Sequence, residues 1–598
     1  MSGPAIIVLG ARGAETAGRI RAGLADGEVH APTCAACVAD IRFAKATAHI
    51  AALFRAGQPI IGVCAAGILI RAVSPHLADK AAEPPVLAVA VDGSCVVPLL
   101  GGHRGANRLA AHVAAALGAT CAVTTAGELA LGIALDDPPP GWRLAPGGDV
   151  KGVTARLLEG EPVRIEVEAG GDGWLAGARL VRATDAALGL ILTHRVTPPR
   201  PETLVYHPPV LALGVGCEKG APAAELSALA RAALAEAGLA PDAVACVASL
   251  ELKAGEPAIH ALATELGRPA RFIDSATAAA QTGRLMSPSA RVAAAVGVPG
   301  VAEAAALAAA GPAGRLLVPK RKSARCTVAI ALAPTAIDPR AVGRCRGRLS
   351  VVGIGTGDPA TRTAAVVERL RIAQHVVGYQ LYLDLVRDVA RDAQQHPFAL
   401  GAEAGRCRLA LHLAGGGAEV VLVCSGDPGV YAMAALVVEL LAAEPGAGWE
   451  QIALEVLPGV SAFQAAAARV GAAIGHDFCA VSLSDLMTPW PVIERRLRAA
   501  AEGDFVVALY NPVSARRRAA LPAARDILLA ARAPDTPVVL ARNLGRPGES
   551  VTIGRLDALD PAAVDMLTVV LVGNRATRCV ARRDGTELVL TPRGYAVG

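Results

Sequence analysis

The sequence predicts a multidomain α/β protein. Its length is the first indication, because 598 residues correspond to about four domains at roughly 150 residues each. Its pattern is the second, because short apolar segments typical of strands alternate with longer segments typical of helices. Strands are expected at residues 5–9, 60–63, 86–91 and 210–215, and helices at residues 108–117 and 225–238. Such alternation is typical of helices layered on mainly parallel sheets.

The composition provides for several hydrophobic cores and argues against nucleic-acid binding. Hydrophobic residues make up 53% of the chain, whereas aromatic residues make up only 3%. So few aromatic side chains cannot supply base-stacking platforms, and the formal net charge is only +5. The basic run 320–325 is therefore interpreted as a solvated face or as an anion contact near a ligand.

No membrane or export segment is expected. The chain opens with the apolar strand 5–9, without a basic start or a small-residue cleavage site. The apolar stretch 60–70 is interrupted by Arg71, well short of the roughly 20 residues that span a bilayer. We therefore expect a cytoplasmic protein.

The cysteines point to reduced thiols rather than to a disulfide framework. The 13 cysteines are scattered along the chain. Cys34 and Cys37 form a Cys-x-x-Cys pair that has no second pair to complete a metal site. No bound metal is expected.

Residues 423–431, Val-Cys-Ser-Gly-Asp-Pro-Gly-Val-Tyr, form the most informative motif. They follow an apolar strand expected at 419–424 and precede a helix that Pro428 can begin. Glycine lets the backbone approach a ligand, and the carboxylate of Asp427 is favourable at a helix N-terminus. Because this acid would repel a phosphate, the loop favours a polar or cationic ligand. The alternative is a purely structural strand-to-helix turn.

Four more segments share this design of an apolar strand that ends in a small or polar loop. They are residues 349–359, 456–463, 505–512 and 567–574. In the first of them, Asp358 stands where a dinucleotide fingerprint needs its third glycine, so a Rossmann site is excluded.

On these motifs, residues 349 to about 590 resemble the tetrapyrrole methylase family, in which two α/β lobes clasp S-adenosylmethionine and a macrocycle. Segments 377–385 and 476–485 resemble its precorrin-3B C17-methyltransferase branch, and they argue against a diphthine or ribosomal RNA methylase. The resemblance implies methylation of a corrin precursor at C17, coupled to the ring contraction that gives precorrin-4. It also implies a corrin intermediate as the small-molecule partner and a homodimer formed through this domain.

The resemblance also implies the cofactor site. The residues expected to contact S-adenosylmethionine are Thr356, Ser425, Gly426, Asp427, Val430, Ser461, Ala462, Tyr510, Asn511 and Gly554. Small residues and backbone amides of this kind can hold a nucleoside and an amino acid without steric conflict. The leaving thioether is neutral, so catalysis of methyl transfer should come mainly from alignment of the reacting atoms.

The catalytic base for ring contraction is left open by the sequence. Related methylases carry an acid just after the second strand of this domain, but residues 377–379 are Val-Gly-Tyr. The candidates are Tyr379, Asp358, Asp384 and His476, each of which could instead be a core residue, a helix cap or a surface group.

The N-terminal half carries a second candidate site. Residues 89–100 are expected to form a β-hairpin, which leads into Gly101–Asn107 before a helix. Glycines, the cations His103 and Arg104, and a helix N-terminus together suggest a carboxylate cradle. The structural interpretation makes Asn107 the N-cap and Gly118 the stop of that helix.

This stretch, with residues 62–71 and 123–126, resembles the N-terminal part of the CbiG family of cobalamin biosynthesis. Residues 211–333 resemble its C-terminal part, also found alone as CobE, through segments 213–220 and 318–323. Residues 129–210, with β-like patches at 163–167 and 188–193, resemble its middle region.

The CbiG resemblance implies a second activity. In the anaerobic pathway this family opens the ring A lactone of cobalt-precorrin-5A and releases acetaldehyde. Lactone opening needs a positioned base or an activated water, for which His103, Glu218 and Lys219 are candidates. With Arg104, they are also the candidate substrate contacts. The alternative is a non-catalytic module that binds or channels corrinoids.

The expected domains follow from these motifs. They are a CbiG N-terminal-like domain at 1–128, a middle region at 129–210, a CobE-like domain at 211–333, a linker at 334–348 and a methylase domain at 349–598.

Overall fold

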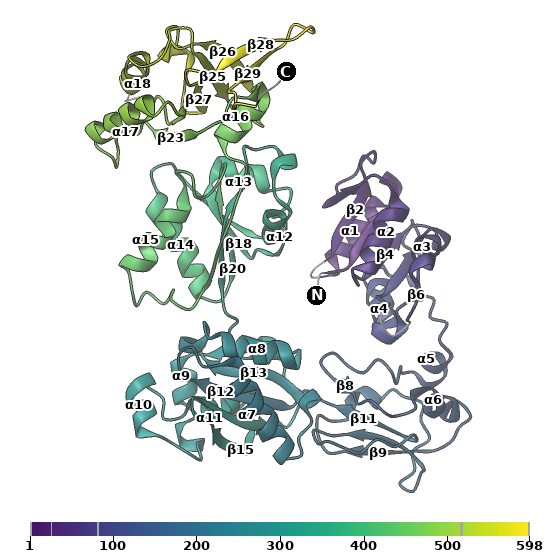
Figure 1. The fold of residues 1–598 in the computed structure, drawn as a ribbon. Coiled ribbons are helices and arrows are strands. Elements are labelled where there is room, and N and C mark those ends of the chain that lie inside the picture. Colours follow the sequence, from purple (N-terminus) through teal and green to yellow (C-terminus); the bar gives the residue numbers. More distant parts are fainter. Residues whose placement is uncertain (1–2, 25–26, 80–82, 515–517, 596–598) are drawn as a thin grey trace. The chain divides into compact units, whose positions relative to one another are not determined.

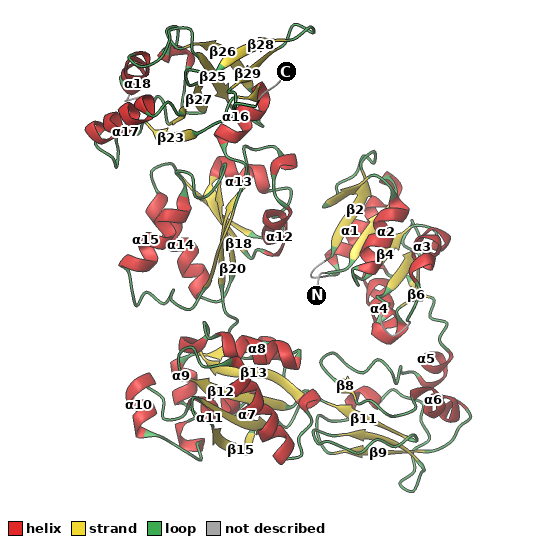
Figure 2. Cartoon of the chain, in the orientation of Figure 1, coloured by secondary structure: helices red, strands yellow, loops and turns green. Residues whose placement is uncertain are grey.

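The computed structural model forms two compact units, Met1–Cys345 and Arg346–Gly598, shown as ribbons in Figures 1 and 2. The structure describes residues 3–24, 27–79, 83–514 and 518–595. Both units layer helices on sheets that are rich in parallel strands, so the predicted α/β class is confirmed. No described helix combines the length and apolar character that a membrane crossing requires.

The first domain is a helix-covered sheet with strand order β3-β2-β1-β4-β5-β6-β7. The strands are β1 (Ala5–Val8), β2 (Glu28–Pro32), β3 (Ile41–Phe43), β4 (Ile60–Val63), β5 (Val86–Val89), β6 (Cys95–Leu100) and β7 (Thr120–Cys121). The helices are α1 (Ala14–Ala22), α2 (Ala46–Arg55), α3 (Ala66–Val73) and α4 (Ala106–Leu117). Alternate strand residues pack against α1 and α4 on one face and against α2 and α3 on the other. The predicted hairpin is confirmed, because β5 and β6 pair antiparallel.

The middle domain is a smaller sheet of order β8-β11-β10-β9. Its elements are α5 (Ala126–Leu131), β8 (Arg143–Leu144), α6 (Val150–Leu158), β9 (Val163–Val167), β10 (Leu188–Leu192) and β11 (Thr203–His207). The two predicted β patches are therefore the strands β9 and β10. The hydroxyl of the fully buried Tyr206 donates to the carbonyl oxygen of Leu135 at 2.7 Å, which fixes the segment between α5 and β8 over this sheet.

The third domain has strand order β14-β13-β12-β16-β15. Its strands are β12 (Leu211–Cys217), β13 (Val244–Leu250), β14 (Ala270–Ile273), β15 (Arg315–Lys322) and β16 (Cys326–Leu332). Its helices are α7 (Ala223–Glu236), α8 (Pro257–Leu266), α9 (Ser275–Ala279), α10 (Ala290–Val296) and α11 (Val301–Ala310). Helix α11 lies so close to β12 that a Cβ atom at Gly214 would come within 2.0 Å of the Ala302 carbonyl oxygen. Only glycine fits there.

Residues 342–344 of the expected linker lie along the edge of this third sheet. The backbones of Phe272 and Arg344 exchange two hydrogen bonds of 2.8 Å, and Arg271 donates to the carbonyl oxygens of Val342 and Gly343. This part of the segment extends the sheet edge and is not a free tether.

The second unit begins with an all-parallel sheet of order β19-β18-β20-β17-β21. Its strands are β17 (Arg348–Gly353), β18 (His375–Tyr379), β19 (Gln394–Phe398), β20 (Glu419–Cys424) and β21 (Ala453–Leu457). Its helices are α12 (Ala364–Ile372), α13 (Gln380–Val386), α14 (Glu403–Gly415) and α15 (Met433–Ala443). Helices α14 and α15 cover one face and α12 covers the other, as Figure 1 shows.

The second lobe of this unit has a mixed sheet of order β23-β24-β27-β25-β26 and a small sheet of order β22-β29-β28. Its helices are α16 (Ala462–Val470), α17 (Trp490–Glu502) and α18 (Ala520–Leu529). Its strands are β22 (Gly471–Ala472), β23 (Phe478–Ser482), β24 (Val506–Tyr510), β25 (Pro537–Arg542), β26 (Ser550–Arg555), β27 (Thr568–Val572), β28 (Arg578–Ala581) and β29 (Glu587–Leu590).

Separate expression of residues 1–345 and 346–598 should give two soluble, folded proteins. Each hydrophobic cluster of the described residues is built entirely within one of the two units, so neither core loses a side chain on cutting. Circular dichroism should show cooperative melting of both pieces. A cut after Gly311 is the control, because it separates β15 and β16 from β12 and should abolish folding of the third domain. Two unfolded pieces from the 345/346 cut would contradict the division.

Candidate functional site

A cavity of about 460 Å³ lies at the carboxyl ends of the strands of the first lobe of residues 346–598, and residues of both lobes line it. The sheet order places the ends of β17 and β20 next to each other. Ligands of open parallel sheets bind at such a carboxyl-end crevice. The lining includes nine residues expected to contact a cofactor: Thr356, Ser425, Gly426, Asp427, Val430, Ser461, Ala462, Tyr510 and Asn511.

Three glycine loops meet beneath this cavity. Gly355 and Gly426 exchange backbone hydrogen bonds of 2.7 and 3.2 Å, and both have positive φ angles of 70° and 67°. A Cβ atom on Gly353 would lie 2.4 Å from the Gly426 carbonyl oxygen, and one on Gly459 would lie 2.2 Å from it. The glycines are therefore required for contact between loops, in addition to any approach to a ligand.

Asp427 joins two of these loops. Its carboxylate accepts hydrogen bonds from the backbone N–H groups of Gly429 at 2.8 Å and of Gly459 at 3.1 Å. The expectation that Pro428 begins a helix is wrong, because α15 begins only at Met433. Tyr431 intervenes with a left-handed φ of 52°, and its hydroxyl donates to the carbonyl oxygen of Ala480 in β23 at 2.9 Å. Asp427 therefore stabilises a loop junction rather than a helix end.

The second lobe supplies the opposite wall. Ser461 is the N-cap of α16 and forms a capping box with Gln464. The backbone N–H of Phe463 donates to the Tyr510 hydroxyl at 3.3 Å, which fixes that ring at the start of the helix. Asn511 has a φ of 49° and donates to the Ser482 hydroxyl at 3.1 Å. These contacts hold the small and aromatic lining residues in place.

Arg546 and Tyr382 are two lining residues that the sequence motifs did not reveal. Arg546 donates from Nε to the Thr356 carbonyl oxygen and from Nη2 to the Ser425 hydroxyl, both at 2.8 Å. Its guanidinium carbon lies 5.7 Å from the centre of the Tyr382 ring. Burial raises the pKa of Tyr382 and lowers the pKa of Arg546. Residues 543–546, Asn-Leu-Gly-Arg, follow strand β25, and this further strand-then-glycine pattern could have found Arg546.

The first unit contains a larger cavity, of about 930 Å³. It lies between the end of β6, the start of α4, and helices α5 and α6. Asn107 lies inside α4 and donates from Nδ2 to the Thr125 hydroxyl at 3.0 Å and to the Glu128 carboxylate at 2.5 Å. The 92% burial of Asn107 protects these bonds from water, so Asn107 holds Glu128 in place at the cavity wall.

Asn107 is therefore not the N-cap that the structural interpretation assigned. The N-cap is Gly105, with a left-handed φ of 88°, and the helix already begins at Ala106. The side chain of Asn107 is occupied by α5, which explains why it does not turn back to cap its own helix. The helix ends at Gly118, with a φ of 64°, as predicted.

The charged residues that line this cavity are mainly acidic, whereas a site that binds a carboxylate was expected to be cationic. Its lining contains four carboxylates, Glu83, Glu128, Asp136 and Asp149, and one cation, Lys151. Arg104 is exposed and is not part of the lining, and the side chain of His103 lies outside the described part of the structure. Burial also raises the pKa of the neighbouring Asp137, although Arg108 lies 3.0 Å away. The cavity therefore disfavours an anionic group.

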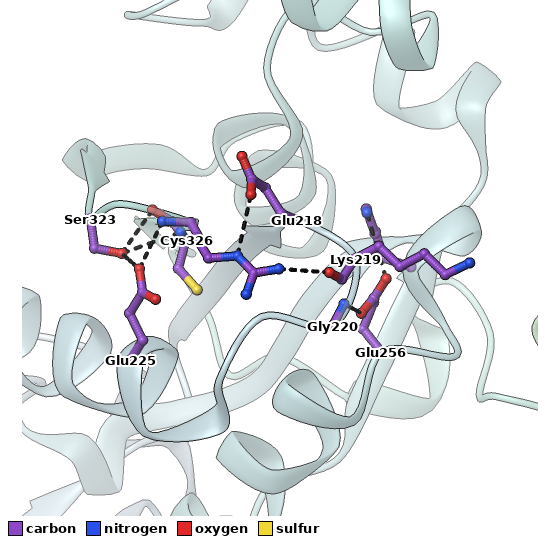
Figure 3. A network of polar contacts seen from close by, with 9 residues as sticks. Glu218, Lys219, Gly220, Glu225, Glu256, Ser323 and Cys326 are labelled. Carbon is purple, nitrogen blue, oxygen red and sulfur yellow. Dashed lines mark hydrogen bonds and ion pairs between the residues drawn. The ribbon is translucent and has the colours of Figure 1, made fainter.

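Glu218 and Lys219 belong to a polar network in the third domain, shown in Figure 3. Arg325 pairs with the Glu218 carboxylate at 3.3 Å and donates to the Lys219 carbonyl oxygen at 2.8 Å. The backbone N–H of Gly220 donates to Glu256 at 3.0 Å. The network fastens the turn after β12 to the turn between β15 and β16, and it lines neither of the two cavities described here.

Comparison with known proteins identifies the second unit. The family described as Tetrapyrrole (Corrin/Porphyrin) Methylases matches residues 348–560. A probable cobalt-factor III C(17)-methyltransferase of Salmonella typhimurium is 43% identical over 249 residues, which are 42% of this chain and 100% of that protein. The precorrin-3B C(17)-methyltransferase of a Sinorhizobium species is 44% identical over 253 residues, which are 42% of this chain and 98% of that protein. The chain belongs to the tetrapyrrole methylase family.

The unit before this methylase unit matches three parts of another family. The Cobalamin synthesis G N-terminal, central and C-terminal regions match residues 48–128, 139–208 and 211–331. The crystal structure of CobE, a protein from the cobalamin (vitamin B12) biosynthetic pathway, is 38% identical, covers 21% of this chain and 89% of that chain, and has a TM-score of 0.20. Both predicted resemblances are confirmed, and a CbiG-like unit precedes a methylase unit in one chain.

The candidate catalytic residues of the methylase unit lie in different places. Tyr379 lines the cavity, with its ring 5.3 Å from that of Tyr382. Asp384 is exposed and accepts hydrogen bonds from Gln380 and Arg387. The remaining two candidates are His476, which is exposed and paired with Asp477, and Asp358, which caps the turn at Pro359. Neither Asp384, His476 nor Asp358 lines the cavity.

Gly554, the remaining residue of the expected cofactor set, lies on the exposed strand β26. It does not contribute to the cavity lining. It pairs with Val538 in β25, and a Cβ atom there would meet nothing within 4 Å.

Asp427→Ala should lower the free energy of unfolding of the methylase unit by about 2 kcal/mol, because hydrogen bonds to a charged acceptor contribute about 1.5–3 kcal/mol each and this carboxylate is half-exposed. Asp427→Asn keeps one acceptor oxygen and should lose about half as much. Urea denaturation of residues 346–598 measures both. Asp526→Ala, at an exposed aspartate on α18, is the control. Equal stability of all three variants would show that Asp427 does not hold the loops.

Proposed function

We propose that the methylase unit transfers a methyl group from S-adenosylmethionine to C17 of a corrin precursor, with ring contraction, in cobalamin biosynthesis. The cavity between its lobes carries this proposal, because it gathers nine residues implied for the cofactor. Relatives that are 43% and 44% identical are named for cobalt-factor III and for precorrin-3B, so a precursor with or without cobalt is the substrate class.

The residues of the cavity fit a nucleoside–amino acid cofactor. Its volume of about 460 Å³ lies within the range of roughly 300–1,000 Å³ that small-molecule sites occupy. Gly426, Ser461 and Ala462 leave space at the loop junction, and the Thr356 and Ser425 loops add polar groups. When bound, S-adenosylmethionine supplies an electrophilic methyl group. The residues of the chain then orient the two reactants, which converts a bimolecular reaction into one between fixed partners.

Ring contraction also moves a proton, and the cavity offers mainly phenols for this step. Tyr379, Tyr382, Tyr431 and Tyr510 line it. Burial raises the pKa values of the last three, so these phenols stay protonated at neutral pH. Tyr379 is the one sequence candidate that lines the cavity, and we propose it as the group that exchanges this proton.

We propose a domain division close to the expected one, with domains at residues 1–128, 129–210 and 211–333. Residues 342–344 belong with the third domain, because they extend the edge of β14, and the methylase unit then begins at Arg346. The homodimer through the methylase unit and the cytoplasmic location stay predictions.

A second activity is proposed for the CbiG-like unit, the opening of the ring A lactone of a corrin intermediate. The cavity at Glu128 favours this activity over a purely binding role. A lactone is uncharged, so the acidic lining admits it, whereas free carboxylate side chains are repelled. Glu128 accepts hydrogen bonds from Asn107 and Thr125 and is thereby fixed as a general base toward water. Hydroxide adds to the carbonyl carbon and the ring C–O bond breaks, which gives a carboxylate and an alkoxide. The alkoxide leaves as acetaldehyde when its carbon–carbon bond to the macrocycle breaks, and the electron pair left on the ring carbon takes up the proton.

Ala462→Leu should lower the affinity of the methylase unit for S-adenosylhomocysteine at least tenfold. The three added carbon atoms occupy the cavity, while the helical backbone of α16 accepts leucine without strain. Isothermal titration calorimetry measures the binding. Ala499→Leu, at an exposed alanine of α17, makes the same change outside the cavity and should bind normally. Normal binding by a folded Ala462→Leu variant would remove this cavity from the cofactor site.

Glu128→Gln should slow lactone opening of cobalt-precorrin-5A about 100-fold or more, which is the usual contribution of a general base. The amide keeps an acceptor for Asn107, so the fold should be unaffected. Methylation at C17 should continue at the wild-type rate. Acetaldehyde release measures the lactone reaction, and Glu159→Gln at the exposed end of α6 is the control. Full hydrolase activity in Glu128→Gln would favour the binding module instead.

A further inference from the structure

Arg546 is a half-buried cation in the methylase cavity without a carboxylate partner. Neighbouring arginines of the same lobe form ion pairs: Arg542 with Asp565, Arg555 with Asp557 and Arg469 with Glu549. Both hydrogen-bond acceptors of Arg546 are neutral oxygens, those of Thr356 and Ser425. Among the described residues, no carboxylate lies within ion-pair distance of its guanidinium.

The two carboxylates that line the cavity, and Asp358 beside Gly357, already accept hydrogen bonds. Asp427 accepts from Gly429 and Gly459. Glu403 lies 3.8 Å from Arg406 and accepts from the backbone N–H of Gly401. The Asp358 carboxylate accepts from Ala360. None of these acids neutralises Arg546 without giving up a bond that holds its own loop.

The fold makes room for this arginine at two glycines. A Cβ atom on Gly357 would lie 2.8 Å from Cγ of Arg546. One on Gly545 would lie 2.7 Å from the Thr356 hydroxyl, and Gly545 has a left-handed φ of 69°. The backbone of both lobes therefore fixes the position of the Arg546 side chain.

Its surroundings compensate the charge only in part. The Tyr382 ring offers a cation–π contact at 5.7 Å, and the two neutral oxygens offer dipoles. Burial lowers the pKa of Arg546, which reports the cost of holding this cation away from water. The hydrogen bonds described above use Nε and Nη2, and Nη1 has no acceptor among the described residues. A bound anion would supply both the charge and the acceptor.

We propose that Arg546 binds a carboxylate of a ligand in the methylase cavity. This inference rests on the proposed function of that unit, whose two ligands both carry carboxylates. One source is the methionine portion of the cofactor, and the other is an acetate or propionate side chain of the corrin precursor. In either case the ligand completes an ion pair at the junction of the two lobes.

The test compares Arg546→Gln with the wild-type full chain. Binding of S-adenosylhomocysteine and of 5′-methylthioadenosine, which lacks the amino-acid carboxylate, is measured by calorimetry. If Arg546 binds the cofactor carboxylate, the affinity for S-adenosylhomocysteine falls about tenfold or more, whereas that for 5′-methylthioadenosine is unchanged. If it binds the macrocycle, both nucleosides bind normally and the KM for precorrin-3B rises by the same factor.

Two control variants show whether Arg546 binds a carboxylate of the ligand or only connects the two lobes. Arg546→Lys keeps the charge and should recover part of the lost affinity, and Arg542→Gln removes a paired arginine near the cavity and should change nothing. Equal losses for both nucleosides, or wild-type values for both nucleosides and for the KM, would overturn the proposal.

The melting temperature of Arg546→Gln without ligands should not fall, because the variant removes an uncompensated cation. Failure of the wild-type chain to bind S-adenosylhomocysteine or to methylate precorrin-3B would count against the proposed function instead.

Discussion

The contact between the glycine loops after β17 and β20 is the constraint on which the methylase cavity depends. Gly355 and Gly426 exchange backbone hydrogen bonds, and Gly353 and Gly459 approach the Gly426 carbonyl so closely that no side chain fits. Because these loops meet, Thr356 and Ser425 face one cavity and can share Arg546. Asp427 then connects the junction to the loop before α16, which brings in the wall from the second lobe.

The two cavities described here differ in charge, and the difference agrees with the chemistry proposed for each. Arg546 gives the methylase cavity a cation without a protein counter-ion. The cavity of the CbiG-like unit carries four carboxylates and one lysine. A corrin precursor with several acidic side chains is attracted by the first arrangement and repelled by the second, unless it presents an uncharged group.

Local patterns in the sequence predicted the α/β class, the strands and hairpin, both family resemblances and nine cofactor residues that line the methylase cavity. The remaining features depend on contacts between distant segments. Asn107 has the residue type and position of an N-cap, but α5 provides Thr125 and Glu128 as stronger partners. Arg546 contacts residues about 120 and 190 positions earlier, and no local pattern encodes such a pairing. The residues 342–344 appear as a basic loop, yet the edge of β14 offers them backbone hydrogen bonds.

The charged residues of each cavity also agree with what the reaction proposed for that cavity requires. Methyl transfer from a sulfonium has a neutral leaving group, so this step needs no fixed base, and the half-buried Arg546 is available for the proposed recognition of a carboxylate. Lactone opening begins with an uncharged ester and a weak nucleophile, so a base must be held in place before the substrate arrives. For the lactone opening proposed here, Asn107 holds Glu128 by a hydrogen bond from inside helix α4. In that proposal, the product carboxylate lies among the like charges of the lining, and this repulsion favours its release.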